Sequence, residues 1–143
     1  MNFCKQNQAG RSMVEMLGVL AIIGVLSIGG IAGYTKAMAK WKVDKVIEQI
    51  SLIRHNLMEF YANRTRYDDL QNTEDAVKIG IIPEEMVEGT AGSYQVVHAA
   101  GGYVTITVTN GRPNITLGNL KRDAAIAIAT ADWGARNISI NNK

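Results

Sequence analysis

The segment from Met16 to Thr35 carries no charged side chain, and it constrains this chain more than any other feature. As an α-helix, about 20 apolar residues rising 1.5 Å each would span the roughly 30 Å hydrocarbon core of a bilayer. A helix also satisfies its own backbone groups, which lipid cannot do. An ordinary secretory signal peptide has a shorter apolar run that ends in a small-x-small cleavage site, which Ala32-Gly33-Tyr34 hardly supplies. The run therefore predicts a helix that anchors the chain in a membrane.

A carboxylate lies directly before this run, at Glu15. An unpaired acid costs ~3 kcal/mol at the middle of a spanning helix and less near the interface, so such a residue is a functional candidate that needs a partner. Residues 1–10 form a short polar leader that has one lysine and ends in Gly10. The order is thus leader, glycine, acid and apolar run.

Gly10, Glu15 and the unbroken apolar run resemble the class III signal of type IV prepilins and the related pseudopilins. The resemblance implies that a prepilin peptidase cleaves between Gly10 and Arg11 and methylates the new N-terminus. The family usually has Phe, Met or Leu at the first mature position, and Arg11 departs from that pattern. In the filament core, Glu15 would pair with the α-amino group of a neighbouring subunit, because a mismatched subunit would leave both charges uncompensated.

Glycines recur along the apolar run. Gly29 and Gly33 form a small-xxx-small pattern that lets apolar helices approach closely, and we expect helix packing to involve Gly18, Gly24, Gly29 and Gly33. No proline occurs before Pro83, so nothing of that kind interrupts the helix.

The charges that flank the apolar run indicate a membrane topology opposite to the one that the resemblance implies. Lys5 and Arg11 precede the run, whereas more lysines follow it: Lys36, Lys40, Lys42 and Lys45. The positive-inside rule taken alone favours a cytoplasmic C-terminal domain. The resemblance implies the opposite, namely a single-pass precursor in the bacterial inner membrane with a periplasmic C-terminal domain, which later reaches the cell surface in a pilus.

The pattern predicts an α+β fold, in which a long N-terminal helix with an apolar first half packs against a small antiparallel β-sheet. The expected divisions are a leader at 1–10, a transmembrane or filament-core helix at 11–35, an amphipathic continuation at 36–62 and a small α/β globular head at 63–143. An apolar stripe with three-four spacing supports the continuation: Val43, Val46, Ile50, Ile53, Leu57 and Phe60.

Shorter elements are expected in the head. They are a helix at 73–79 closed by Gly80, strands at 94–98 and 103–109 joined as a hairpin, a turn at 110–113, a third strand at 115–117, a helix at 120–130 capped by Asn119 and an edge strand at 137–140. The head more loosely resembles the type IVb pilin branch, which commonly closes its C-terminal region with a disulfide. Because Cys4 is the single cysteine, that region would be held by packing around Trp133.

No enzymatic function is predicted, since the sequence lacks a phosphate-binding loop, a zinc motif and a nucleophile elbow. We expect no cofactor or metal, and we interpret Asp68-Asp69 and Glu84-Glu85 as surface charge and His55 as solvated. A net charge of +2 does not argue for nucleic acid.

The leading hypothesis is a structural pilin whose partners, as the resemblance implies, are copies of itself, a prepilin peptidase and a pilus assembly platform. Two alternatives stay open. One is a pseudopilin of a type II secretion system, and the other is an uncleaved signal-anchored protein whose head binds a ligand.

Overall fold

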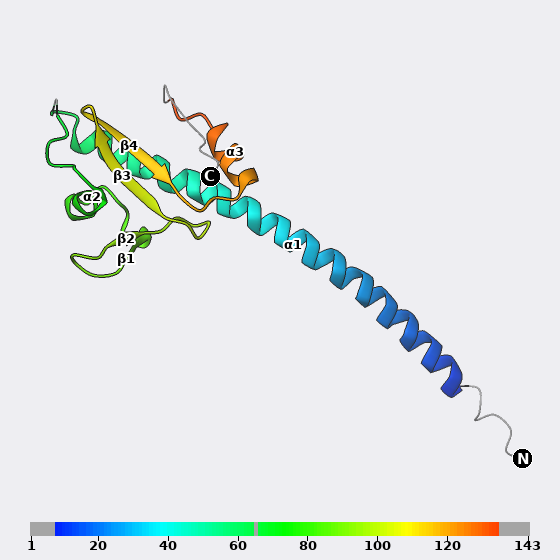
Figure 1. Cartoon of the computed structure of the whole chain (residues 1–143). Coiled ribbons are helices and arrows are strands. Elements are labelled where there is room, and N and C mark those ends of the chain that lie inside the picture. The colour runs from blue at the N-terminus through cyan, green and yellow to red at the C-terminus, as the bar shows by residue number, and fades with distance from the viewer. Residues whose placement is uncertain (1–7, 65, 135–143) are drawn as a thin grey trace, which may run out of the picture. The chain divides into compact units, whose positions relative to one another are not determined.

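The computed structural model describes residues 8–64 and 66–134. The helices are α1 (Gln8–Phe60), α2 (Thr73–Ile79) and α3 (Arg122–Ala129), with a 3-10 turn η1 (Glu84–Met86). The strands are β1 (Val87–Glu88), β2 (Gln95–Val96), β3 (Val104–Thr109) and β4 (Arg112–Leu117). The chain forms two units, Met1–Lys40 and Trp41–Lys143. The predicted α+β fold is confirmed (Figure 1).

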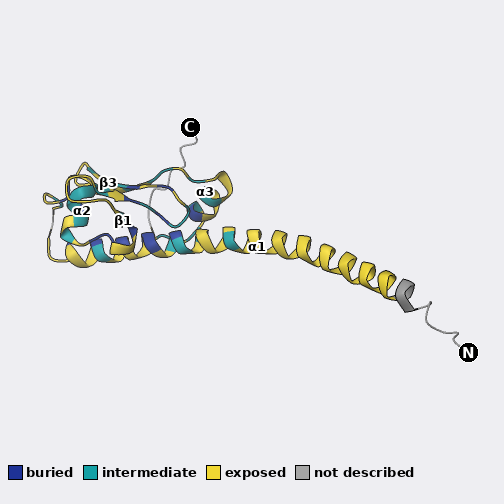
Figure 2. Ribbon diagram, turned by 90° about the horizontal axis from the view of Figure 1, so that it is seen from below, coloured by how far each residue is buried: buried dark blue, intermediate teal, exposed yellow. Residues whose placement is uncertain are grey.

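The part of α1 that lies in the first unit is exposed on all sides. Every residue from 12 to 37 is exposed, although most are apolar (Figure 2). The large apolar side chains from Met13 to Tyr34 range from 52% exposed at Ile23 to 73% at Ile28. An exposed apolar surface of this length on a soluble chain would be exceptional, so it marks a membrane or protein contact.

The rest of α1 buries one stripe, as the sequence predicts. Val46, Ile50, Ile53 and Leu57 are at most 7% exposed. Phe60 is an exception to the predicted stripe, because it is 41% exposed and Tyr61 is buried in its place. The Tyr61 N–H donates to the Leu57 carbonyl at 3.1 Å, so the backbone keeps one more helical hydrogen bond after Phe60. The ring of Tyr61 is therefore placed on the buried side, next to Leu57.

The main sheet of the head is the hairpin β3–β4. Val104, Ile106 and Val108 alternate along β3, pair with Leu117, Ile115 and Pro113 of β4, and face the core beside α1 (Figure 1). Asn110 and Gly111 both have positive φ, at 53° and 72°, which is the two-residue type I′ turn that matches strand twist.

Pro113 therefore lies inside β4, and the predicted turn at 110–113 was too long. Thr109 and Arg112 flank the turn and form a hydrogen-bonded pair, so the next pair, Val108 and Pro113, is a non-hydrogen-bonded one. The nitrogen of Pro113 points away from β3, and its missing N–H removes nothing from the ladder. The third strand accordingly begins at Arg112 and not at residue 115.

The predicted hairpin between strands 94–98 and 103–109 forms only at the end next to its turn, where Val97 bridges Tyr103 and the His98 N–H donates to the Gly102 carbonyl at 2.8 Å. β2 pairs with β1, a short strand that the sequence did not indicate, with Val87 opposite Val96. Only one isolated bridge, Val97 to Tyr103, joins the segments that were expected to pair. The edge of β3 that faces away from β4 is covered by α2, where the Thr73 hydroxyl accepts the Ile106 N–H at 3.0 Å.

Both short helices form, although one cap differs from the prediction. Asn72 caps α2 by accepting the Asp75 N–H at 3.0 Å, and Gly80 ends it in the left-handed region at φ 82°. The cap residue of α3 is Lys121, without a side-chain hydrogen bond. Asn119 has a φ of 58° and turns the chain before the helix, so the predicted cap was wrong. The predicted strand at 137–140 lies outside the described residues.

Two clusters make up the core of the head. The larger one joins α1 to β3, α2 and the segment around η1 through residues that include Ile53, Leu70 and Met86. The smaller one joins Val46 and Ile50 to Ile128 of α3, and Trp133 packs against it. Trp133 therefore packs where the sequence predicted a hydrophobic contact, and the rest of the C-terminal region, residues 135–143, lies outside the described residues. The Trp133 Nε1–H donates to the Ile128 carbonyl at 2.6 Å, and Arg54 donates to the Trp133 carbonyl.

Candidate functional site in the N-terminal helix

Between Met16 and Gly33 the apolar part of α1 carries one polar side chain, Ser27, whose hydroxyl is bonded within the helix. The hydroxyl of Ser27 donates to the Ile23 carbonyl at 2.7 Å, and that of Thr35 donates to the Ala32 carbonyl at 3.0 Å. These bonds within one helix remove the hydroxyls of Ser27 and Thr35 from competition with its surroundings, and the Tyr34 hydroxyl lies at the end of the segment. Among the described residues, α1 is the one helix long and apolar enough to cross a membrane.

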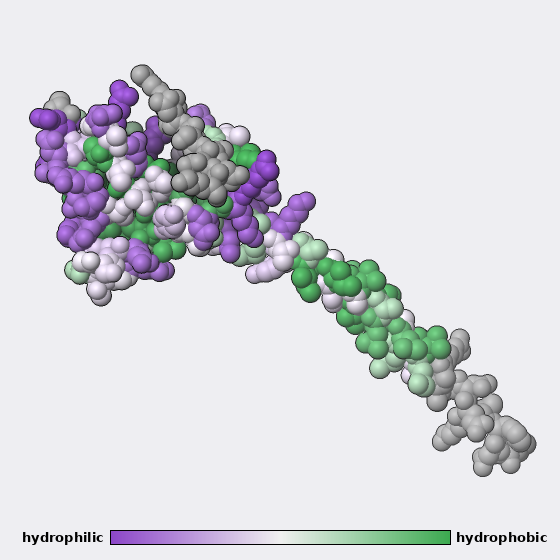
Figure 3. All heavy atoms as spheres, viewed as in Figure 1, coloured by the Kyte–Doolittle hydropathy of each residue, from purple (hydrophilic) through white to green (hydrophobic). Residues whose placement is uncertain are grey.

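Figure 3 shows the same property over the visible face of the helix, where hydrophobic residues follow one another without a polar interruption. None of the apolar window is buried within the chain itself. Because burying apolar surface is worth about 25 cal/mol per Å², a helix with this surface is stable only when lipid or other helices cover it.

The predicted site residues lie on this helix, and for some of them the structure describes the backbone alone. Glu15 is exposed, and it stands at the start of the uncharged run. Gly10 and Arg11 lie within the helical backbone of α1, which begins at Gln8, upstream of the predicted cleavage position. The leader and the globular head remain predictions as separate domains.

The glycines do not all share one face. At about 100° per residue, Gly18, Gly29 and Gly33 fall within one sector of roughly 60°, whereas Gly24 points to the other side of the helix. A Cβ atom added at any of these glycines would meet nothing within 4 Å. The glycines therefore leave room for a neighbouring helix without serving a contact within the chain.

Sequence reasoning missed two buried polar side chains in the head, Gln49 and His98. Gln49 Oε1 accepts the Ala99 N–H at 2.9 Å, and its Nε2 donates to Glu85 Oε1 at 3.4 Å. His98 Nδ1 accepts the Ala100 N–H at 3.2 Å, which makes Nε2 the donor to the Gly118 carbonyl, 3.0 Å away. Gln49 could have been suspected, because it falls beside the apolar stripe between Val46 and Ile50. These residues hold loops together, and neither lines the depression on the head that is described below.

The charged residues of the head form surface pairs. Lys45 Nζ lies 3.2 Å from Glu48 Oε2 and 3.7 Å from Glu85 Oε1, and its hydrogen bond to Glu48 raises the pKa of Lys45 above its usual range. The pKa of Lys78 is raised in the same way by its hydrogen bond to Glu74. The side chain of His55 is 71% exposed, which confirms that it is solvated.

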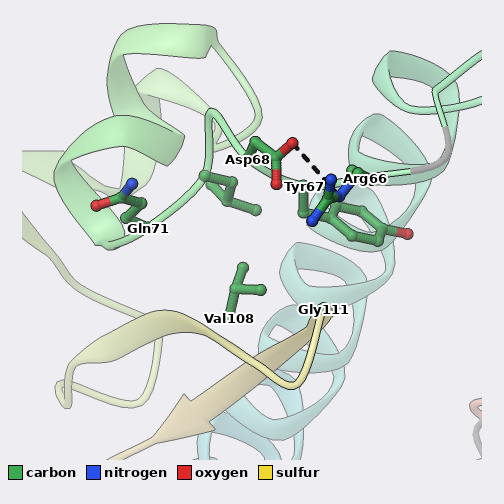
Figure 4. A pocket seen from close by; sticks show the side chains of 7 residues that line it. Arg66, Tyr67, Asp68, Gln71, Val108 and Gly111 are labelled. Atoms are coloured by element: carbon green, nitrogen blue, oxygen red, sulfur yellow. Dashed lines mark ion pairs between the residues drawn. The ribbon is translucent and has the colours of Figure 1, made fainter.

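A depression of about 690 Å³ lies on the head (Figure 4). Its lining residues are Arg66, Tyr67, Asp68, Leu70, Gln71, Val108 and Gly111. Arg66 Nε lies 3.6 Å from Asp68 Oδ2, and Arg64 is paired with Asp69, so arginines accompany both acids of this loop. Within residues 8–64 and 66–134, no group of three His, Cys, Asp or Glu side chains could hold a metal ion.

A long helix that is apolar and exposed in its first half, and that packs a small antiparallel-strand head against its second half, fits a type IV pilin. The chain is similar to the type IV major pilin protein PilA of Myxococcus xanthus (strain DK1622), with 29% identity over 92 residues. This alignment covers 64% of the present chain and 38% of the relative, so the chain matches well under half of that protein's length. No family model matches the chain, and no solved structure matches it.

Proposed function

We propose that this chain is a structural subunit of a type IV pilus-like filament, which is cleaved after Gly10 and assembles through its N-terminal helix. The observation that carries the proposal is the complete exposure of an apolar helix from residue 12 to residue 37. A helix that buries nothing inside its own chain must be covered by lipid or by other helices. The helix of a pilin would be covered by lipid in the membrane precursor and by other helices in the filament.

The similarity to a major pilin supports the structural role and the filament. The partners that follow from this role are copies of the same chain, a prepilin peptidase and an assembly platform in the inner membrane. The precursor would be a single-pass protein with its head in the periplasm, and the assembled subunit would lie in a pilus at the cell surface. Neither catalysis nor a cofactor enters the proposed role.

Removal of leader residues 1–10 would create an α-amino group on Arg11, which is cationic at neutral pH. Glu15 lies one helical turn further along the chain and is the first acid of the sequence. In a filament core, the amine of one subunit and Glu15 of its neighbour would neutralise each other where water is scarce. Such a pair sets the axial register of the subunits.

The direct test is mass spectrometry of the protein recovered from filaments sheared off the cells. The proposal expects a chain that starts at Arg11, with or without one methyl group. Filaments built from chains that still carry Met1 would refute the processing step. Cells that make the protein but no filament containing it would refute the structural role.

The depression beside Arg66 and Tyr67 favours one competing function, a head that binds a ligand while α1 acts as a tether. That function needs no cleavage at Gly10 and no filament. It predicts that the membrane-extracted protein keeps Met1 and remains monomeric. The same mass spectrum and the same micrographs therefore separate the two functions.

A further inference from the structure

One edge of β4 is open among the residues whose placement is described. The Gly118 N–H donates to the Tyr103 carbonyl at 2.9 Å, which makes these two residues a hydrogen-bonded pair at the end of the β3–β4 ladder. Hydrogen-bonded and non-hydrogen-bonded pairs alternate along an antiparallel ladder, so the N–H groups of Ile115 and Leu117 point away from β3. Neither of these N–H groups has an acceptor within residues 8–64 and 66–134.

The opposite edge of the same sheet is covered. The N–H of Ile106, which points away from β4, donates to the Thr73 hydroxyl of α2 at 3.0 Å. An open edge is a template for a further strand, and native proteins cover such an edge or blunt it. Pro113 blunts the open edge of β4 at one position only, because it has no N–H. The edge is therefore able to accept a strand at Ile115 and Leu117.

The core-facing side of β4 is also less covered than that of β3. Val104 and Ile106 of β3 are 3% and 1% exposed. Leu117 and Ile115, which pair with them in β4, are half-buried. Burying the rest of this apolar surface would be favourable, because each Å² removed from water is worth about 25 cal/mol. The open edge thus has room for further apolar side chains.

The chain returns to this region at Trp133 and Gly134. The guanidinium of Arg54 donates to the Trp133 carbonyl, and a Cβ atom added at Gly134 would lie 3.3 Å from the same guanidinium. Trp133 packs against the cluster around Ile128, and the core-facing residues of β4 pack against it too. Residues 135–141 extended at about 3.3 Å each reach roughly 23 Å, which is longer than the ~20 Å of the six-residue β4.

The sequence after Gly134 alternates in the same way as β4. Residues 137–141 read Asn-Ile-Ser-Ile-Asn, and this alternation predicts a strand with Ile138 and Ile140 on one face and polar side chains on the other. In β4, Asn114 and Thr116 are exposed between half-buried residues that face the core. A strand with the alternation of residues 137–141 therefore matches β4 on both faces.

We infer that residues 137–141 add to the open edge of β4 as a third strand of the same chain. Ile138 and Ile140 then cover the core-facing side of β4, and backbone carbonyls of the added strand accept the N–H groups of Ile115 and Leu117. Three strands with one apolar face are more stable than an isolated hairpin. The inference does not rest on the proposed filament.

The segment of the same chain is favoured over that of a second copy. Trp133 and Gly134 are already held at Arg54, so a short linker joins the anchored backbone to residues 137–141. A short flexible linker gives an effective concentration in the millimolar range, which a second copy in dilute solution does not reach.

Amide hydrogen exchange of the full-length protein in detergent, followed residue by residue by NMR, tests the pairing. The N–H groups of Ile115 and Leu117 should be protected in the unmodified chain. In a chain that stops after Gly134, their exchange should become faster by about ten-fold or more. The N–H groups of Asn114 and Thr116, which bond to β3, should change by less than about two-fold.

A matched pair of full-length variants separates the strand from a general loss of stability. Ile138→Ser combined with Ile140→Ser removes the apolar face and should give the same faster exchange at Ile115 and Leu117. Asn137→Ser combined with Asn141→Ser makes as many changes on the polar face and should keep the exchange within about two-fold. An equal effect of the two double variants would overturn the inference.

Two further outcomes would overturn it. One is fast exchange of the N–H groups of Ile115 and Leu117 in the unmodified chain, which would leave the edge open. The other comes from mixing an isotope-labelled chain that stops after Gly134 with unlabelled full-length protein, which should leave the exchange fast. Restored protection would mean that a second copy supplies the strand. Since no filament enters these experiments, their failure would leave the proposed function intact.

Discussion

Gln49, on the buried face of α1, accepts the backbone N–H of Ala99 at 2.9 Å, across a sequence separation of 50 residues. Its side chain is 6% exposed. The bond connects the helix to the loop that leads from β2 to β3, where a single bridge joins the two segments. The Gln49 side chain thus holds the loop where the sequence predicted a longer hydrogen-bonded strand pair.

Replacement of Gln49 should destabilise the head. Gln49→Ala leaves the Ala99 N–H without its partner in a buried position, which costs about 1–3 kcal/mol. Denaturant unfolding of the full chain in detergent, followed by tryptophan fluorescence, measures the change in free energy. Gln95→Ala, at an exposed strand position, is the control and should change it by less than ~0.5 kcal/mol. Equal effects of both variants would contradict the role of Gln49.

Removal of the Tyr61 hydroxyl should not destabilise the protein. Tyr61 is 5% exposed, and its hydroxyl oxygen has no hydrogen-bond partner in the described part of the chain. Because a buried unpaired polar group costs about 1–3 kcal/mol, Tyr61→Phe should be neutral or stabilising by up to ~1 kcal/mol in the same unfolding experiment. A loss of more than ~1 kcal/mol would reveal a partner for this hydroxyl.

Alkaline pH should weaken the head through the same residue. Burial raises the pKa of Tyr61 above its usual 10.0, so the folded state holds this proton more tightly than the unfolded state does. The contribution is complete below pH 10 and is lost as the pH rises through the folded pKa. Unfolding midpoints measured from about pH 8 to 11 should fall less steeply in Tyr61→Phe than in the unmodified chain.

Trp133 should hold α3 through its indole nitrogen as well as its ring. Trp133→Phe keeps most of the apolar contact with the cluster around Ile128 but removes the 2.6 Å hydrogen bond to the Ile128 carbonyl. We expect a loss of about 1 kcal/mol in the free energy of unfolding. Trp41→Phe, at a side chain that is 55% exposed, is the control and should be nearly neutral. Hydrogen exchange at α3 should rise in the first variant alone.

Replacement of Glu15 should stop assembly without affecting the head. Glu15→Ala removes the acid that would pair with the α-amino group of a neighbour in the proposed filament, and leaving a buried charge unpaired costs about 3–5 kcal/mol, equivalent to far more than a ten-fold loss of filaments. Glu59→Ala removes an acid whose side chain is 77% exposed and should have little effect. Electron microscopy of sheared material counts the filaments, and normal fibres from Glu15→Ala would refute the role.

Regular patterns in the sequence were enough to predict the long elements. The uncharged run and the three-four stripe from Val46 to Leu57 give α1, and Gly80 gives the end of α2. Each of these signals is local, since helix periodicity and capping depend on residues within one or two turns.

Strand pairing was the part that could not be predicted. β1 and β2 are each two residues long, too short to leave an alternating pattern, and their pairing depends on contacts between distant segments. Asn119 failed as a cap because the chain needs its left-handed backbone to turn before α3. The candidate site was visible in the sequence as Glu15 before an apolar run, whereas the partner that we propose for it would lie in another molecule and leaves no trace in a single chain.

Because the Ser27 hydroxyl is bonded within the helix, the stretch of α1 from Met16 to Gly33 needs no hydrogen-bond partner in its environment. Lipid acyl chains and the aliphatic side chains of neighbouring helices can surround this helix equally well, because neither is needed to complete a hydrogen bond. A subunit could therefore pass from one medium to the other as a rigid piece, with no step of unwinding and rewinding.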